Sequence, residues 1–124
     1  MTQARIYHLA LPADWGSAAE RGSYAVSTRG VSLADEGFIH CSFAHQIEPV
    51  ANRWYRDLDE LVIVRLDLEQ LTSEVRVEPS SDGSGELFPH VYGPIPAAAA
   101  AETVVWTRES GQDWALPDGI ETAE

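Results

Sequence analysis

Blocks of apolar residues divide the chain into short strands and helices. The block Leu61 to Leu66 shows no alternation of apolar and polar positions, which predicts a central strand that is buried on both faces. Val75 to Glu78 alternates, as a half-exposed strand does. Three further short apolar runs predict strands: Ile6 to Leu9, Phe38 to Cys41 and Thr103 to Thr107.

Helical periodicity is clearest after residue 43. A helix is expected from Ala44 to Tyr55, with Ser42 as its N-cap. Pro49 should kink this helix or delay its start, because proline lacks the N–H of the hydrogen-bond ladder. A shorter helix is expected from Trp15 to Arg21, and a single helical turn from Ala97 to Glu102. The short strands and helices together predict an α+β domain on a mixed or antiparallel sheet.

The length of the chain, 124 residues, is that of one domain. We expect a globular domain over residues 1–110 and an acidic C-terminal tail over 111–124, from which Trp114 and Leu116 could fold back. The apolar runs are far shorter than the roughly 20 residues of a membrane span. No apolar segment follows the N-terminus as in a signal peptide, and Cys41 has no partner cysteine, so a cytoplasmic location is expected.

The charged residues of the chain indicate which kinds of ligand it can bind. The net charge is −12, and all eight cationic side chains are arginines. This charge argues against nucleic acid as the partner, since affinity for nucleic acid comes largely from cationic groups. The absence of lysine excludes a Schiff-base or P-loop lysine, so an anionic ligand would be bound by arginine or backbone amides. The remaining expectation is a small-molecule ligand.

Three histidines, His8, His40 and His90, follow apolar residues at predicted strand positions. Each one alone is best read as a core or turn imidazole bonded to the backbone. Three in one small domain favour convergence on a pocket, because burying imidazoles without a purpose lowers stability. A metal site is the first alternative, but only His40 and His45 are close in sequence, without the cadence of a zinc site.

A Cys41 nucleophile is the second alternative, because the thiol precedes an expected helix start. Neighbouring residues on a strand point to opposite faces. If His40 faces a pocket, Cys41 faces the core, and Ser42 shares the face of His40. The rigid segment Phe88 to Pro94 carries His90 and Tyr92 and could form a wall.

These motifs together resemble the bacterial domain-of-unknown-function family 952 over roughly residues 5 to 107. The resemblance rests on Tyr7-His8, Trp15, Gly22-x-Tyr24, Glu36-Gly37-Phe38-Ile39-His40-x-Ser42, Gln46 and Phe88-Pro89-His90-x-Tyr92-Gly93-Pro94. More distantly, the chain is similar to the ADP-ribosyltransferase superfamily, in its RNA 2′-phosphotransferase branch. His8 matches the first-strand histidine there, and Phe38-Ile39-His40-Cys41-Ser42 matches a second motif that ends in histidine, another residue and serine.

The distant resemblance implies a split mixed or antiparallel sheet with short flanking helices and a cleft that binds NAD. It implies His8, His40 and Ser42 as catalytic residues. Beside them we expect six residues to contact the ligand: Tyr24, Arg29, Phe38, Arg53, His90 and Tyr92. Leu9-Ala10 stands where that branch has Gly-Thr, and no acidic residue matches the glutamate of mono-ADP-ribosylating relatives.

Three functions stay open from the sequence. The first is an enzyme that transfers or hydrolyses ADP-ribose from NAD in a histidine-lined cleft. The second is a non-catalytic module that binds a nucleotide-like or anionic small ligand. The third is a metal-dependent hydrolase.

Overall fold

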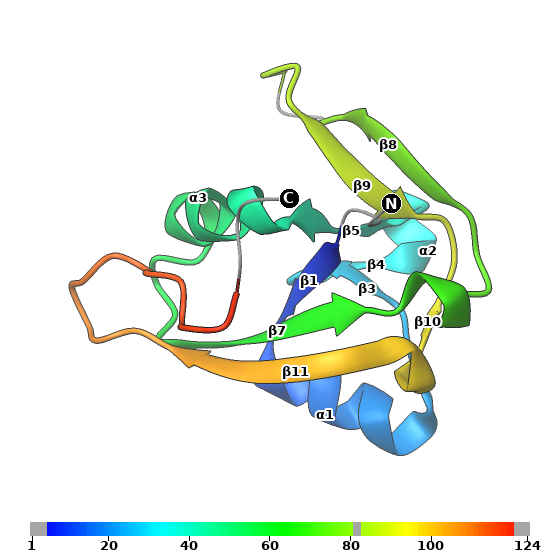
Figure 1. The fold of residues 1–124 in the computed structure, drawn as a ribbon, viewed down its shortest axis with the longest axis horizontal. Helices are drawn as coiled ribbons and strands as arrows, with labels where there is room; N and C mark the ends of the chain where they lie inside the picture. Colours follow the sequence, from blue (N-terminus) through cyan, green and yellow to red (C-terminus); the bar gives the residue numbers. More distant parts are fainter. Residues whose placement is uncertain (1–4, 81–82, 121–124) are drawn as a thin grey trace.

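The computed structural model describes residues 5–80 and 83–120, and within them the chain has the α+β composition expected from its sequence (Figure 1). The helices, including two 3-10 turns, are α1 (Pro12–Arg21), α2 (Leu33–Glu36), α3 (Ala44–Trp54), η1 (Leu68–Gln70) and η2 (Ala97–Ala99). The strands are β1 (Ile6–Ala10), β2 (Ser23–Tyr24), β3 (Val26–Thr28), β4 (Val31–Ser32), β5 (Ile39–His40), β6 (Ser42–Phe43), β7 (Glu60–Leu66), β8 (Val75–Pro79), β9 (Leu87–Val91), β10 (Ile95–Pro96) and β11 (Ala100–Thr107).

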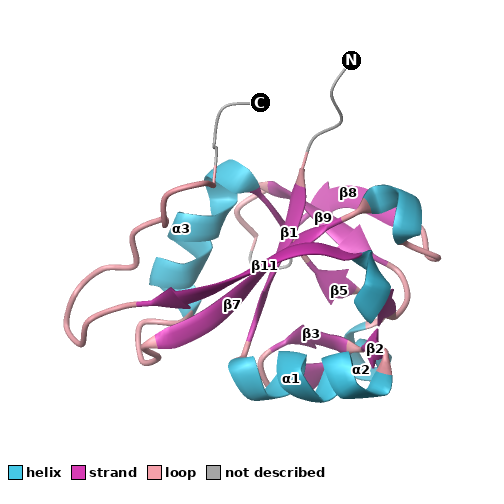
Figure 2. Ribbon diagram, turned by 60° about the horizontal axis from the view of Figure 1, so that its bottom comes forward, coloured by secondary structure: helices cyan, strands magenta, loops and turns pink. Residues whose placement is uncertain are grey.

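The main sheet has four antiparallel strands in the order β11-β7-β1-β6. The predicted central strand is confirmed, because β7 lies between β11 and β1 and is buried over most of its length. Alternate residues of β1 and β7 enter two separate hydrophobic cores. One core includes Ala18 of α1 and the other includes Ile47 and Ala51 of α3, so helices cover both faces of this sheet (Figure 2).

A second, three-stranded antiparallel sheet has the order β5-β9-β8 and carries the long β8–β9 hairpin (Figure 1). The strand expected over Phe38 to Cys41 is shorter than predicted, because it covers only Ile39–His40 and the chain changes sheets at Cys41. Residues Ile39–His40 pair with β9, whereas Ser42–Phe43 pair with β1. At the crossing, the Cys41 N–H donates to the Pro89 carbonyl at 3.0 Å. Sheet membership is set by distant partners, so the local apolar run could not reveal this break.

The predicted helix after residue 43 is confirmed as α3, which contains Pro49. Its N-cap is Phe43 rather than the expected Ser42, because Ser42 is still paired in β6. At this end of the helix, the Phe43 backbone N–H donates to the side-chain oxygen Oε1 of Gln46 at 3.0 Å. The turn expected over Ala97 to Glu102 is shorter than predicted, since β11 already begins at Ala100.

The segment expected to be a tail folds back on α3. The Trp114 side chain is 1% exposed, and its Nε1 donates to the Tyr55 carbonyl at 2.9 Å. The Leu116 N–H donates to a carboxylate oxygen of Glu48 at 2.9 Å. Residues 121–124 of the expected tail, and 81–82 of the loop between β8 and β9, lie outside the described residues. Across the described ranges, no helix is both long enough and apolar enough to span a membrane.

Candidate functional site

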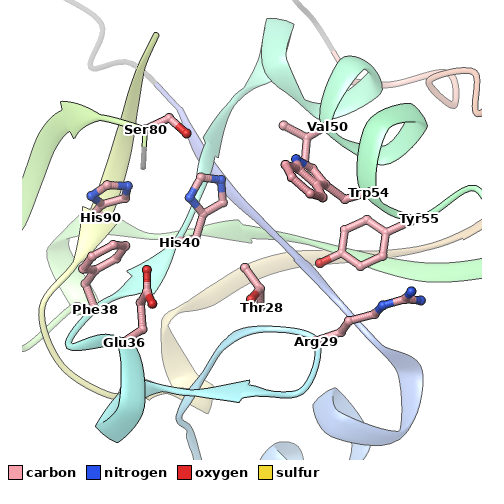
Figure 3. A pocket seen from close by; sticks show the side chains of 10 residues that line it. All are labelled: Thr28, Arg29, Glu36, Phe38, His40, Val50, Trp54, Tyr55, Ser80 and His90. Carbon is pink, nitrogen blue, oxygen red and sulfur yellow. The ribbon is translucent and has the colours of Figure 1, made fainter. Parts of the chain in front are cut away.

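A cavity of about 510 Å³ opens between the β5–β9 strands and helix α3. That volume is within the range of small-molecule binding sites. Strand β3, the turn after it and the end of α2 close the remaining side. The lining residues are Thr28, Arg29, Glu36, Phe38, His40, Val50, Trp54, Tyr55, Ser80 and His90 (Figure 3). We refer to this cavity as the main pocket.

Aromatic rings of neighbouring strands build one wall of the main pocket. His40 and His90 are cross-strand partners in β5 and β9, and their ring centroids are 5.5 Å apart. The Phe38 ring stacks on His90, with centroids 3.9 Å apart and planes 18° apart. Phe88 packs beside His40 at 4.8 Å. The strand pairing therefore brings together Phe38, His40 and His90, which are three of the residues predicted from the sequence.

Helix α3 supplies the opposite wall through Val50, Trp54 and Tyr55 (Figure 3). They lie within the range Ala44 to Tyr55 of the helix predicted from the sequence, but the sequence did not identify them as pocket residues. Trp54 is 54% exposed, which is unusual for so large an apolar side chain. An exposed indole beside a cavity is available to stack on a planar ligand ring. Helical periodicity indicated the helix itself. The cavity beside the helix could not be predicted in this way, because it is formed with the β5–β9 strands, which are distant in sequence.

Two opposite charges lie in the lining of the main pocket, Arg29 and Glu36. The Arg29 guanidinium pairs with Asp57 at 3.0 Å and lies 5.7 Å from the centre of the Tyr55 ring. The hydrogen bond from Arg29 lowers the pKa of the Asp57 carboxyl. Glu36 ends helix α2, just before a left-handed Gly37 that turns the chain toward Phe38. The pocket thus contains a carboxylate that the motif comparison did not identify as a candidate.

His8 does not reach the main pocket. Its side chain is 2% exposed, with Nδ1 2.7 Å from the His40 carbonyl and Nε2 2.7 Å from the Tyr24 hydroxyl. Burial lowers the pKa of His8 from 6.5 to about 4, so the ring is neutral at pH 7. Because a carbonyl only accepts, Nδ1 carries the proton and Nε2 accepts from Tyr24. Both nitrogens are then used inside the protein, and His8 and Tyr24 offer neither donor nor stacking face to a ligand in the main pocket.

His8, His40 and Ser42 all line a second, narrow recess, which shares some lining residues with the main pocket. The recess measures about 10 Å³, which is at the lower limit of the space that one water molecule occupies. Ser42 is 3% exposed and is not in the lining of the main pocket. Cys41 is buried on the core side, as alternation predicts, and burial raises the pKa of its thiol. A thiol in that environment stays protonated and is a poor nucleophile.

The other two predicted contact residues lie outside the lining of the main pocket. The Arg53 guanidinium lies over the Trp54 ring, 4.9 Å from its centre. The Tyr92 hydroxyl donates to Oε1 of Glu78, behind the wall formed by His90. Arg53 therefore contacts a lining residue, Trp54, whereas Tyr92 contacts Glu78, the hydrogen-bond partner of His90. Among the described residues, no group of three His, Cys, Asp or Glu side chains is arranged to hold a metal ion.

Comparisons with known proteins agree with this fold and leave the chemistry open. The crystal structure of protein CC0527 from Caulobacter crescentus has a TM-score of 0.78 and 26% identity, covering 94% of this chain and 97% of that one. The solution NMR structure of CC0527 gives a TM-score of 0.71 and 26% identity, covering 87% and 89%. No curated protein matches. The sequence profile of the family described as "Protein of unknown function (DUF952)" matches residues 9–103, and the chain therefore belongs to this family.

Proposed function

We propose that this protein binds a nucleotide-like small molecule in the main pocket, with NAD as the first candidate, and transfers or hydrolyses its ADP-ribosyl group. The observation that carries the proposal is the composition of the pocket. A cavity of about 510 Å³ is lined by aromatic rings on two sides, and its described lining includes an arginine and a carboxylate. The distant resemblance to ADP-ribosyltransferases, in sequence motif and expected architecture, supports the choice of NAD.

The rings suit a planar base or nicotinamide. Phe38 and His90 are already stacked on each other, and Trp54 stands on the other side of the cavity with more than half of its surface exposed. Burying a planar ring between such faces is favourable through both lost apolar surface and ring stacking. The volume is that of a ligand of modest size, so part of a dinucleotide would extend past the exposed Trp54 into solvent.

Arg29 is suited to a phosphate. The Arg29 side chain is 38% exposed and its guanidinium lies over Tyr55, where the planar fork can bind two oxygens of one anion. Asp57 now pairs with this fork, and its own side chain is 62% exposed. An exposed pair of this kind contributes little stability, so a phosphate could displace Asp57 at a small energetic cost.

Glu36 is the group suited to the chemistry. Breaking the bond between ribose and nicotinamide sends the bonding electron pair to nicotinamide and leaves a cation on the ribose. A nearby carboxylate stabilises that charge until an oxygen nucleophile adds and loses its proton. Glu36 is the carboxylate in the described lining of the main pocket, and His40 and His90 are its neighbours there.

Calorimetric titration with NAD and ADP-ribose, followed by chromatography of the incubated NAD, tests the proposal. We expect binding in the millimolar range or tighter. Arg29→Gln should weaken binding of both compounds about tenfold, because it removes charge-assisted hydrogen bonds to phosphate. Glu36→Gln should bind NAD but form no nicotinamide, whereas Glu20→Gln on α1 should behave as the wild type. No heat of binding for either compound at millimolar concentration would refute the proposal.

A non-catalytic binding module is the second candidate, and one observation favours it. Two of the three residues that the resemblance implies as catalytic, His8 and Ser42, are buried away from the main pocket. Binding of NAD or ADP-ribose without any product after prolonged incubation would favour this function over the enzyme. The metal-dependent hydrolase is not proposed, because the described residues provide no donor set for it.

A further inference from the structure

A carboxylate flanks His90 on the side away from His40, because the sheet order is β5-β9-β8. Glu78 of β8 and His90 of β9 lie on paired strands, and Oε1 of Glu78 is 2.9 Å from Nδ1 of His90. The same oxygen accepts the hydroxyl hydrogen of Tyr92. These hydrogen bonds, first from Tyr92 and then from His90, lower the pKa of Glu78. The carboxylate is therefore ionised at neutral pH and acts only as an acceptor.

The Glu78 carboxylate beside Nδ1 determines which ring nitrogen of His90 carries the proton. A carboxylate cannot donate, so the hydrogen must lie on Nδ1, and in the neutral ring Nε2 keeps its lone pair. The ring is also fixed in orientation by the stacked Phe38, 3.9 Å away between centroids, and by His40 across the strand pair. His90 is thus held by a carboxylate at one edge and by aromatic contacts on its face.

The second nitrogen of His90 faces the main pocket. His90 is a lining residue, and the described residues form no hydrogen bond with its Nε2. Within the same described residues, no buried side-chain nitrogen or oxygen lacks a hydrogen-bond partner. Nε2 is therefore not sealed in the core, although the side chain as a whole is only 4% exposed. The His90 side chain lines the cavity, and Nε2 is its ring nitrogen without a hydrogen bond to the described residues (Figure 3).

We propose that His90 is the proton acceptor of the main pocket and that Glu78 is its positioning residue. Nε2 of His90 accepts a hydrogen bond from an O–H or N–H group of the ligand, and a ribose hydroxyl is the donor class that fits the proposed function, on which this inference rests. In the reaction, the oxygen nucleophile that adds to the ribose cation forms the new C–O bond with a lone pair, and its O–H proton moves to Nε2 while the O–H bonding pair stays on that oxygen. The resulting imidazolium is neutralised by the Glu78 carboxylate. A paired carboxylate and imidazole is an established arrangement for such proton transfer.

The position of the proton can be measured without knowledge of the ligand. Long-range ¹H–¹⁵N correlation spectra of the labelled protein distinguish protonated from unprotonated imidazole nitrogens, and a His90→Gln variant assigns the signals. We expect the proton of His90 on Nδ1 in the wild type and a shift toward Nε2 in Glu78→Ala. Glu74→Ala is the matched control, because Glu74 is an exposed carboxylate that pairs with Arg76 and not with His90. Wild-type His90 with its proton on Nε2, or a Glu78→Ala spectrum unchanged from the wild type, would overturn the assignment.

Titration of the same labelled samples with NAD and ADP-ribose tests the acceptor role. Binding should move the Nε2 resonance of His90 in the direction of hydrogen-bond acceptance, and Glu78→Ala should weaken affinity about two- to tenfold. Saturation of the pocket with the Nε2 resonance unmoved would refute the acceptor role and leave the proposed function standing. Failure of both compounds to bind would instead remove the proposed function, while the proton position would still decide whether Glu78 positions His90.

Discussion

Acid should weaken this fold through His8. The ring is buried with both nitrogens hydrogen-bonded, and burial lowers its pKa from 6.5 to about 4. Well above pH 6.5 the ring is neutral in both the folded and the unfolded chain, so protonation of His8 takes nothing from the free energy of unfolding. Between 6.5 and about 4 the unfolded chain binds a proton that the folded chain does not, and stability falls with pH. Below about pH 4 both states bind the proton and the loss ends.

The magnitude follows from the size of this shift. Each pKa unit corresponds to about 1.4 kcal/mol, so lowering the pH from about 7.5 to about 5 should remove roughly 2 kcal/mol through His8 alone. The complete loss by pH 4 is roughly 3 kcal/mol, a large part of the stability of an ordinary small domain.

Urea unfolding followed by tryptophan fluorescence at a series of pH values measures this dependence, since Trp106 and Trp114 are buried. The free energy of unfolding should fall less steeply between pH 6.5 and 5 in a His8→Gln variant, because the glutamine side chain does not titrate. NMR provides an independent reading, because the ring signals of folded His8 should stay constant over that range. A titration step of folded His8 near pH 6.5, or a loss of stability below about 0.5 kcal/mol by pH 5, would refute the reasoning.

Three further predictions follow from individual contacts. Tyr24→Phe leaves Nε2 of His8 buried without its donor and should lower the free energy of unfolding by about 1–3 kcal/mol in urea titrations, with little effect on NAD affinity; a stable variant that loses NAD binding would instead make Tyr24 a ligand residue. The Cys41 thiol, whose pKa is raised by burial, should resist a thiol-reactive dye in the native protein and react once urea unfolds it; rapid labelling of the native protein would contradict that burial. Gly93→Ala places a Cβ 1.9 Å from Oγ and 2.7 Å from Cβ of Ser73, so it should lower the free energy of unfolding by about 1–3 kcal/mol. An unchanged free energy of unfolding would show that Ser73 moves aside.

The elements most evident from the sequence are those with dense local patterns. The unbroken apolar run of β7 and the helical periodicity of α3 predicted both elements to within a residue or two. The cap of α2 is equally local, since the Ser32 hydroxyl accepts from the Asp35 N–H at 3.1 Å. In each case the decisive interactions lie within the element itself or along one of its faces.

Features that depend on distant partners were harder to predict. The division at Cys41 arises because the residues on its two sides pair with different strands, Ile39–His40 with β9 and Ser42–Phe43 with β1. Alternation correctly sent the Cys41 side chain to the core, but it could not show that His8 would be enclosed by Tyr24 and the His40 carbonyl. A residue pattern identifies the face of a strand, whereas the presence of a cavity at that face is decided by the elements that pack over it.

The same limit applies to the site. Phe38, His40 and His90 were recognised because their motifs are dense in constrained and aromatic residues, and they line the main pocket. Glu36 and Trp54 were not proposed as site residues, because one ends a short helix and the other lies on an apolar helix face. Only the three-dimensional packing places them beside the histidines.

An NMR titration of the ¹⁵N-labelled protein with NAD, repeated with ADP-ribose, tests the central claim most directly, because it reports both affinity and location. The account predicts saturable shifts at millimolar concentration or below, concentrated at Phe38, His40, His90 and the indole N–H of Trp54. Spectra that stay unchanged at millimolar NAD and ADP-ribose, or shifts confined to residues remote from the main pocket, such as the exposed Val105, would contradict it.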